Sequence, residues 1–381
     1  MSRFATLRLS RAPLAVFAAM GVLWGTFAAD LPDLKAMLGI SETGLGLLLF
    51  MTPIAAMAAM LAAPAIGRIL GRYALPVSAL AMALAFALPG QAAAHWGLFA
   101  FAMLACGAGT GATDVLMNAR ISALEAKGGA PLMNLCYAGY SFGYAAGALG
   151  VGALRSQGLP PSVVMPVMAL LAGALILMAF EPDGRIDGLS RPKGETASGL
   201  GWVPVIGGGI VLIAFLTENA AESWSALHIE QTLGGSPALG AAGPAVLALT
   251  MGVARLGGQG LATRIDAVPL MIGGALVSAL GALTVALAGS PAAAYAGFIV
   301  MGIGSSVIAP TAFTLVGQLS DPAKRARAIA RATLLGYFGY FIGPPVVGFV
   351  AGGFGLPAAF AFAAVMLLTI LALAPVMGRH R

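Results

Sequence analysis

Carboxylates within apolar stretches are the first residues of this chain that could do chemistry. Glu218 and Glu222 stand one helical turn apart in the outer part of a strongly apolar run. An ionised side chain is costly in an apolar environment, so such residues are by default candidates for function. Two interpretations stay open. The carboxylates carry a proton between two states of the protein, or they occupy a helix end that water already reaches.

Three other polar residues lie in or beside apolar runs. Asp114 and Asn118 are also one helical turn apart. They suit either a functional pair or a structural clamp to Arg120 or to a neighbouring helix. Asp30 precedes Pro32, a position typical of a solvated helix end. We keep Asp30 and Asp114 with the two glutamates as the predicted proton-coupling set.

Five of the seven tyrosines follow helical spacing in two separate segments. Tyr137, Tyr140 and Tyr144 repeat at i, i+3 and i+7, and Tyr337 and Tyr340 repeat at i and i+3. They form either an interfacial aromatic belt or the wall of a cavity that offers ring faces and hydroxyl groups to a solute. The predicted solute-binding residues are Trp24, Asn118, Tyr137, Tyr140, Tyr144, Trp224, Tyr337 and Tyr340.

Basic residues occur in two groups between apolar runs. Arg68 and Arg72 follow the second run, and Arg255 and Arg264 are expected in the loop after the eighth run. They determine topology, or they act as a gate by neutralising the negative C-terminal ends of adjacent helices.

The composition identifies the elements that must position these residues. Of 381 residues, 59% are apolar and 9% are charged, and the mean hydropathy is +0.94. A soluble domain carries about 25% charged residues, so the sequence predicts an all-α polytopic membrane protein. Since a spanning helix needs about 20 residues, we expect twelve transmembrane helices. The predicted runs are 13–32, 44–66, 74–92, 96–119, 131–154, 160–180, 202–222, 241–262, 267–289, 292–316, 328–351 and 355–376.

The charges between these runs predict the orientation of the chain. If the N-terminus is cytoplasmic, eighteen of the twenty Lys and Arg residues lie inside, and only Lys35 and Arg155 lie outside. This asymmetry follows the positive-inside rule and predicts that both termini are cytoplasmic. The N-terminal segment resembles a secretory signal, but we expect it to remain as the first crossing.

The sequence divides near its middle. The polar stretch 181–201 holds seven of the 34 charged residues. We interpret it as a cytoplasmic linker between two pseudo-symmetric six-helix bundles, at 1–180 and 202–381. An offset of 196 residues aligns the halves and pairs Gly143 with Gly339 and Gly147 with Gly343. These glycines repeat every four residues and predict a smooth ridge that admits a neighbouring backbone closely.

Two halves, a central linker and repeated basic inner loops resemble the major facilitator superfamily over essentially the whole chain. Its signature after the second helix is roughly G-x-x-x-D-R-x-G-R. The segment 64–72 keeps Gly71 and Arg72 and has Arg68 in place of the acid. The fourth helix lacks the membrane-embedded Arg of many proton-coupled members.

Three segments are similar to one bacterial inner-membrane permease branch that includes sugar, rhizopine and riboflavin importers. They are Asp114-Val-Leu-Met-Asn118 with Glu125, the stretch 218–227 (ENAAESWSAL) and the stretch 336–345 (GYFGYFIGPP). The resemblance implies a cavity lined by helices 1, 4, 7 and 10, with helices 2, 5, 8 and 11 shaping its walls. On that map the residues that converge are Trp24, Asp114, Asn118, Tyr137, Tyr140, Glu218, Tyr337 and Tyr340.

Together these features predict a secondary active transporter that works by alternating access. With no basic residue expected inside the cavity, we expect a neutral solute taken up with a proton. Riboflavin is the first choice, and a sugar or cyclitol permease or an efflux pump is the alternative. We expect a monomer in the bacterial inner membrane that needs no cofactor, metal or nucleic acid. A membrane enzyme would need converging catalytic groups, and we find no such motif.

Overall fold

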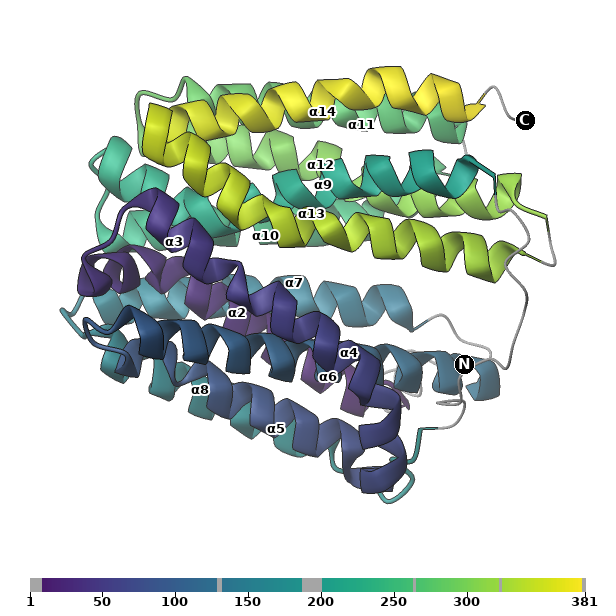
Figure 1. Cartoon of the computed structure of the whole chain (residues 1–381), viewed down its shortest axis with the longest axis horizontal. Coiled ribbons are helices and arrows are strands. Elements are labelled where there is room, and N and C mark those ends of the chain that lie inside the picture. Colours follow the sequence, from purple (N-terminus) through teal and green to yellow (C-terminus); the bar gives the residue numbers. More distant parts are fainter. Residues whose placement is uncertain (1–8, 129–131, 187–200, 263–264, 322–323, 379–381) are drawn as a thin grey trace. The chain divides into compact units, whose positions relative to one another are not determined.

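The computed structural model describes residues 9–128, 132–186, 201–262, 265–321 and 324–378, and its regular elements in these ranges are helices (Figure 1). Short 3-10 turns occur at η1 (Gly71–Tyr73), η2 (Pro89–Gln91) and η3 (Leu177–Ala179). The helices of the first half of the sequence are α2 (Arg11–Leu38), α3 (Glu42–Leu49), α4 (Met51–Leu70), α5 (Ala74–Phe86), α6 (Trp96–Gly128), α7 (Met133–Arg155) and α8 (Pro161–Ile176).

The second half of the sequence repeats this pattern. Its first helix runs on into a short π-helical segment, η4 (His228–Thr232). The helices are α9 (Val203–Leu227), α10 (Pro237–Ala262), α11 (Ala267–Ala286), α12 (Pro291–Leu319), α13 (Arg325–Phe354) and α14 (Leu356–Gly378).

The twelve predicted runs each correspond to a helix, with α3 and α4 together forming the second. Ten stretches of the described residues are long and apolar enough to cross a membrane. One of them, 42–91, contains the helices of two predicted runs. The remaining helix, α7, falls outside this set and carries polar residues along its length, including three tyrosines and Arg155. The predicted all-helical fold is therefore confirmed.

The helices gather into two compact units. Unit 1 comprises residues 1–40, 48–193 and 236–245, and unit 2 comprises residues 41–47, 194–235 and 246–381. Each unit thus corresponds largely to one half of the sequence and includes one short segment of the other half. The two exchanged segments, 41–47 and 236–245, each include the first residues of a helix, α3 in one case and α10 in the other.

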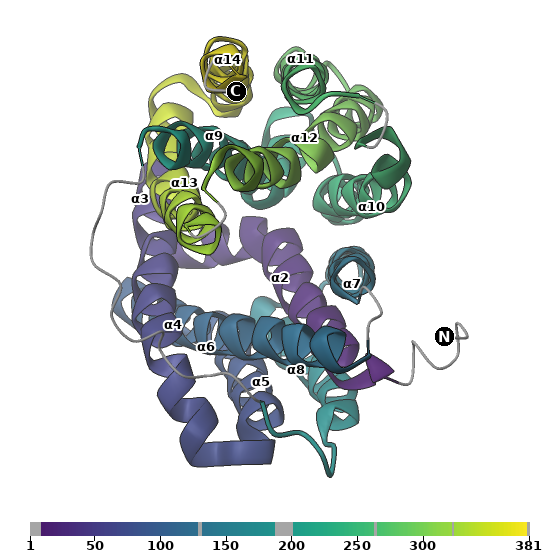
Figure 2. The same ribbon diagram turned by 90° about the vertical axis from the view of Figure 1, so that its right-hand side faces the viewer.

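In unit 1, the glycine ridge of α7 packs closely against α2 (Figure 2). A Cβ atom placed on Gly143 would overlap the backbone carbonyl of Ala18, and one on Gly147 would overlap that of Val22. The approach is mutual, because a Cβ on Gly21 would overlap the backbone of Tyr140. The predicted close backbone contact is confirmed.

The corresponding helices of unit 2, α13 and α9, pack in the same way. A Cβ atom on Gly339 would overlap the carbonyl of Leu212, and one on Gly343 would lie 3.3 Å from the Asn219 side-chain oxygen. Small residues at such contacts allow helices to gain packing where no hydrophobic driving force acts between them. Both tyrosine-bearing helices are therefore held against the first helix of their own unit.

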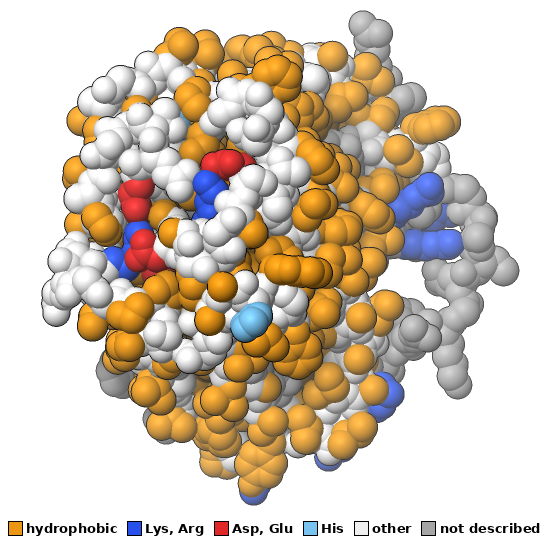
Figure 3. Space-filling view, turned by 60° about the vertical axis from the view of Figure 1, so that its left-hand side comes forward, with side chains coloured by type: hydrophobic (Ala, Val, Ile, Leu, Met, Phe, Trp, Pro, Cys, Tyr) orange, Lys and Arg blue, Asp and Glu red, His pale blue; other side chains and the backbone are white. Residues whose placement is uncertain are grey.

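Many large apolar side chains are exposed, and they cover much of the face that Figure 3 shows. Among them are Leu61, 71% exposed, Ile69, 82% exposed, and Leu170, 75% exposed. An exposed apolar surface of this extent matches helices that face lipid.

Candidate functional site

An ion pair joins two helices inside unit 2. The Glu218 side chain on α9 is 9% exposed, and its Oε1 accepts a hydrogen bond from Nη2 of Arg255 at 3.1 Å. Arg255 lies within α10, seven residues before the helix ends at Ala262. The expectation that Arg255 belongs to an inner loop is therefore wrong. The end of the eighth apolar run, predicted at residue 262, matches the end of α10. Arg255 is accommodated within that helix because the Glu218 carboxylate faces it.

Glu222 lies one turn further along α9 and is half-buried. It interacts electrostatically with both Glu218 and Arg255. The two predicted carboxylates therefore share one cation, and with all three groups ionised the cluster carries one net negative charge. An excess of negative charge inside a membrane protein favours binding of a proton or a cation there.

An aromatic cluster adjoins this ion pair. The ring of Phe215 lies 4.7 Å from that of Tyr340 and 5.9 Å from that of Tyr337, measured between centroids. Tyr340 also interacts electrostatically with Arg255. Phe215 was missed in the sequence, although it lies one turn before Glu218 and therefore on the same side of α9. A helical projection through Glu218 would have found it.

Trp224 occupies the core of unit 2. Its side chain is 0% exposed, and its Nε1 has no hydrogen-bond partner among the described residues. Contact with a solute remains a prediction for Trp224, because the ring is enclosed by protein in this structure.

The predicted aromatic residues of unit 1 form separate contacts. Trp24 is half-buried and packs edge-on against Phe27 and Phe86, with centroids 5.9 and 5.0 Å away. The rings of Tyr140 and Tyr144 are 6.0 Å apart. Tyr144 is nearly enclosed at 2% exposure, so its ring lies inside unit 1.

Tyr137, at the start of the tyrosine series on α7, is the most exposed of the three. Its side chain is 39% exposed, and its ring packs edge-on against Phe17 at 5.0 Å. The three tyrosines thus extend from an open end of α7 into the buried interior of unit 1.

Asp114 and Asn118 interact within α6. The Asn118 amide donates to the backbone carbonyl of Asp114 at 2.9 Å and to its carboxylate at 3.1 Å. Both residues are half-buried. Arg120 is not their clamp, because its Nη2 donates to Glu181 at 2.9 Å. The pair stays a candidate for solute or proton binding.

Asp30 is not at a solvated helix end, contrary to the more favoured interpretation of its position. The helix α2 continues through Pro32 to Leu38 and ends at Gly39, whose φ is +64°. The Asp30 side chain is 0% exposed and lies 3.7 Å from Nε of Arg155. A proline lacks only one N–H, so tertiary contacts can hold a helix together across it.

The dominant partner of Arg155 is Asp33. Nε and Nη2 of Arg155 donate to the two carboxylate oxygens of Asp33 at 2.7 and 2.6 Å. Nη1 of Arg155 donates to the carbonyl of Ala29 at 2.8 Å. Arg155 was expected only as an outer loop charge, so this pair was missed in the sequence. The i, i+3 spacing of Asp30 and Asp33, which places both on one helix face, is the signal that could have pointed to a shared cation.

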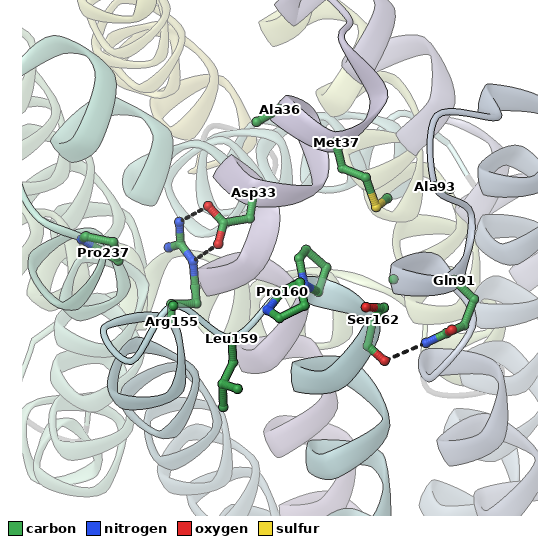
Figure 4. Close-up of a pocket in the computed structure, with 13 residues that line it drawn as sticks. Asp33, Ala36, Met37, Gln91, Ala93, Arg155, Leu159, Pro160, Ser162 and Pro237 are labelled. Carbon is green, nitrogen blue, oxygen red and sulfur yellow. Dashed lines mark hydrogen bonds and ion pairs between the residues drawn. The ribbon is translucent and has the colours of Figure 1, made fainter.

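Asp33 and Arg155 line a pocket of about 790 Å³ in unit 1. Figure 4 shows their paired hydrogen bonds and, across the pocket, the bond from the Gln91 amide to the carbonyl of Ser162, 2.8 Å long. Ala93, which also lines the pocket, has a φ of +48°, the one non-glycine residue with positive φ among the described residues.

Two of the remaining predicted gating residues, Arg68 and Arg72, lie at the end of α4 and in η1, which follows it. Arg68 is in the last turn of that helix, where a cation is favourable. Arg72 donates to the hydroxyl of its neighbour Tyr73 at 2.6 Å. Arg264 lies outside the described residues. A gating role for these residues stays a prediction.

Sequence comparisons place the chain among known membrane carriers. The profile of the Major Facilitator Superfamily matches residues 208–379. An uncharacterized MFS-type transporter of Yersinia pestis is 33% identical over 376 residues, covering 96% of this chain and 94% of that protein. Membrane protein MosC of Rhizobium meliloti is 26% identical over 369 residues, covering 95% and 88%.

Solved structures share the fold at low sequence identity. The nucleoside transporter NupG (D323A mutant) has a TM-score of 0.78 at 14% identity, covering 96% of this chain and 99% of that one. The D-xylose-proton symporter has a TM-score of 0.70 at 15% identity, covering 98% and 97%. With a relative at 33% identity over nearly its full length, this chain belongs to the major facilitator superfamily of membrane transporters.

Proposed function

We propose that this protein carries a small, neutral organic solute across the bacterial inner membrane by alternating access, with uptake driven by a proton. Transport is the activity of the family to which the chain belongs. The nature of the solute and of the coupling ion rests on the residues of the two units, and above all on the Glu218–Arg255 ion pair beside the aromatic cluster of unit 2.

The charge balance at this cluster favours a neutral solute. The sequence predicted a neutral solute because no basic residue was expected inside the cavity, and the position of Arg255 within α10 removes that argument. A different one replaces it. Arg255 is already bonded to Glu218, and Glu222 adds a further carboxylate. A phosphorylated or dicarboxylate solute would therefore meet a net negative charge, and its binding would be opposed.

The side chains near the ion pair suit a planar or hydroxylated solute. Phe215, Tyr337 and Tyr340 supply ring faces, and stacking on such faces favours a flat heteroaromatic ring. The hydroxyl groups of Tyr337 and Tyr340, like side-chain amides, form hydrogen bonds with hydroxyl groups on a solute. Riboflavin combines both features and is our first choice.

A sugar or cyclitol is the second candidate. Tyrosine rings also pack against sugar faces, and a D-xylose-proton symporter shares the fold. Uptake of each solute, measured separately in the same assay, distinguishes these possibilities.

The ion pair supports the proposed proton coupling. A proton that binds Glu218 removes the charge that holds Arg255, so the bond between α9 and α10 weakens. Binding of proton and solute can then favour one of the two access states over the other. This scheme gives Glu218 the role of proton carrier and Arg255 that of its switchable partner.

The test is solute uptake by purified protein in liposomes under an imposed pH gradient. Labelled riboflavin, D-xylose and a cyclitol are offered separately, with the wild type and Glu218→Gln compared. We expect the wild type to concentrate riboflavin and the variant to exchange it without concentrating it. Concentration by Glu218→Gln at the wild-type level would contradict the coupling role. Accumulation of sugar or cyclitol in place of riboflavin would select the second candidate.

A further inference from the structure

A line of polar residues continues along α9 beyond the carboxylate pair. Ser225 and His228 follow Glu218 and Glu222 at the spacing i, i+4, i+7 and i+10. At 3.6 residues per turn these positions succeed one another along one side of the helix. Neighbours in such a series have Cβ atoms about 5–6 Å apart. The line covers about 15 Å at a rise of 1.5 Å per residue.

The last two members of the line are fully buried polar groups. Ser225 and His228 are both 0% exposed. The Ser225 hydroxyl and His228 Nδ1 have no hydrogen-bond partner among the described residues. Buried polar groups in folded proteins are almost always hydrogen-bonded, to protein or to ordered water. Two such groups in succession on one helix therefore point to a bound partner.

The state of the His228 ring follows from its other contacts. Nε2 lies 3.1 Å from the backbone carbonyl of Val285. A carbonyl only accepts, so Nε2 carries the hydrogen and Nδ1 presents a lone pair. The ring also packs on Phe360 at 5.1 Å between centroids. His228 Nδ1 is thus an acceptor in an otherwise apolar setting.

Apart from Arg255 on α10, charged groups of the neighbouring helices do not account for this arrangement. The described helices α11, α12 and α14 contain no Asp, Glu, Lys or Arg. The titratable groups near the line are Glu218, Glu222, Arg255 and Tyr340 at one end and Glu230 in η4 at the other. The basic residues of α13, which also packs on α9, are Arg325, Arg327 and Arg331 in its first two turns. At His228 the helix changes to the π form, which opens the backbone and occurs often at functional sites.

We propose that a chain of internal water molecules follows this line from His228 past Ser225 to Glu222 and Glu218, and that it delivers the coupling proton. The proposal rests on the proton-coupled function given above. With neighbouring Cβ atoms about 5–6 Å apart and hydrogen bonds of about 2.8 Å, one water is the right size to join the polar groups at each step. Buried waters make about three hydrogen bonds, and the line offers a donor or acceptor at each position.

The proton balance of this relay is simple. A proton joins the water that donates to His228 Nδ1, and each water passes one on to the next oxygen, including the Ser225 hydroxyl. The last proton binds a carboxylate of Glu222 or Glu218. Every water, the Ser225 hydroxyl and the imidazole end with the number of protons they began with.

The experiment measures carboxyl protonation directly and needs no solute. Purified protein in lipid is subjected to a rapid pH drop, and the infrared carbonyl band of protonated Glu218 and Glu222 is followed in time. Glu218→Gln and Glu222→Gln assign the band. We expect Ser225→Ala and His228→Gln to slow its appearance about tenfold. In His228→Gln the amide nitrogen lies near the position of Nε2. The donor to the Val285 carbonyl is therefore kept, and the acceptor at Nδ1 is lost.

Two further variants separate a water path from a packing role. Thr217 lies on the same helix at 0% exposure, and its hydroxyl is satisfied by the carbonyls of Ile213 and Ala214 at 2.9 and 3.0 Å. Thr217→Val should leave the rate unchanged. His228→Asn places an amide oxygen near the position of Nδ1 and loses the bond to Val285. The glutamates of this variant should therefore be protonated faster than those of His228→Gln.

The outcomes are distinct. Equal rates in the wild type, Ser225→Ala and His228→Gln would overturn the water path while leaving proton coupling intact. So would the reverse order of the two His228 variants, because a packing role depends on the Val285 bond. Absence of any titrating carboxyl band in the wild type would overturn proton coupling by these glutamates, and the path with it.

Discussion

Oε1 of Glu218 on α9 and Nη2 of Arg255 on α10 lie 3.1 Å apart, although the two residues are separated by 37 positions in the sequence. The carboxylate is 9% exposed and the guanidinium side chain 30%. Each group thus offsets a charge that would be costly alone at this depth. The pair connects the first and second helices of the C-terminal half of the sequence, and it lies beside the aromatic cluster of unit 2.

Loss of either member of this pair should destabilise the protein. Arg255→Gln leaves a nearly buried carboxylate without its cation, and breaking a buried pair in this way costs about 3–5 kcal/mol. The double variant Glu218→Gln/Arg255→Gln removes both charges and should recover much of that loss. Thermal unfolding of the purified variants in detergent measures the difference. A double variant less stable than Arg255→Gln would show that the two charges do not interact.

The Arg155 cluster of unit 1 should behave asymmetrically. Arg155 and Asp30 are 0% exposed, whereas Asp33 is 37% exposed. Arg155→Gln removes the cation from two carboxylates, so we expect a loss of about 3–5 kcal/mol. Asp33→Asn keeps the Arg155–Asp30 pair and places its own amide partly in solvent, so it should lower the unfolding temperature less. Similar unfolding temperatures for the two variants would contradict this reasoning.

Added side chains should damage the contact between α2 and α7. Gly143→Ala introduces a Cβ that overlaps backbone atoms of Ala18, which cannot move aside as a side chain can. Overpacking typically costs about 1–3 kcal/mol. Gly173→Ala in α8 is the matched control, since no atom lies within 4 Å of its added Cβ. That control should be neutral or stabilising by about 0.5–1 kcal/mol, as alanine suits a helix better. Unfolding temperatures report both effects.

The aromatic cluster should determine affinity for a flat solute. Removal of the Phe215 ring should raise KM for riboflavin about 2–10-fold, because an aromatic pair contributes about 0.5–1.5 kcal/mol. Phe338→Ala provides the control. That ring is 43% exposed on α13 and packs on Phe341, so its loss should leave KM unchanged. Equal KM values for wild type and Phe215→Ala would place the solute elsewhere.

The charge asymmetry of the loops predicts which ends of the helices face the cytoplasm. In a variant without Cys106 and Cys136, single cysteines replace the exposed residues Ser162 and Asp183. A maleimide that does not cross membranes should label position 162 in intact cells and position 183 only after lysis. Labelling of position 183 in intact cells would reverse the orientation.

The sequence by itself determined the number, order and approximate ends of the helices. Each helix requires a long apolar run with few charges, a local property of the chain. The sequence also predicted the glycine ridges of α7 and α13, because glycines spaced four residues apart are enough to create a smooth helix face.

Only the tertiary structure decided which charged groups meet. Pro32 favours an end to α2, yet Asp30 and Asp33 on that helix bind Arg155 of α7, and the helix continues. Arg255 occupies the interior of α10 because Glu218 faces it across the helix contact. These outcomes depend on which side chains of separate helices face each other, and the energy of a buried charge is set by that neighbour rather than by its own segment.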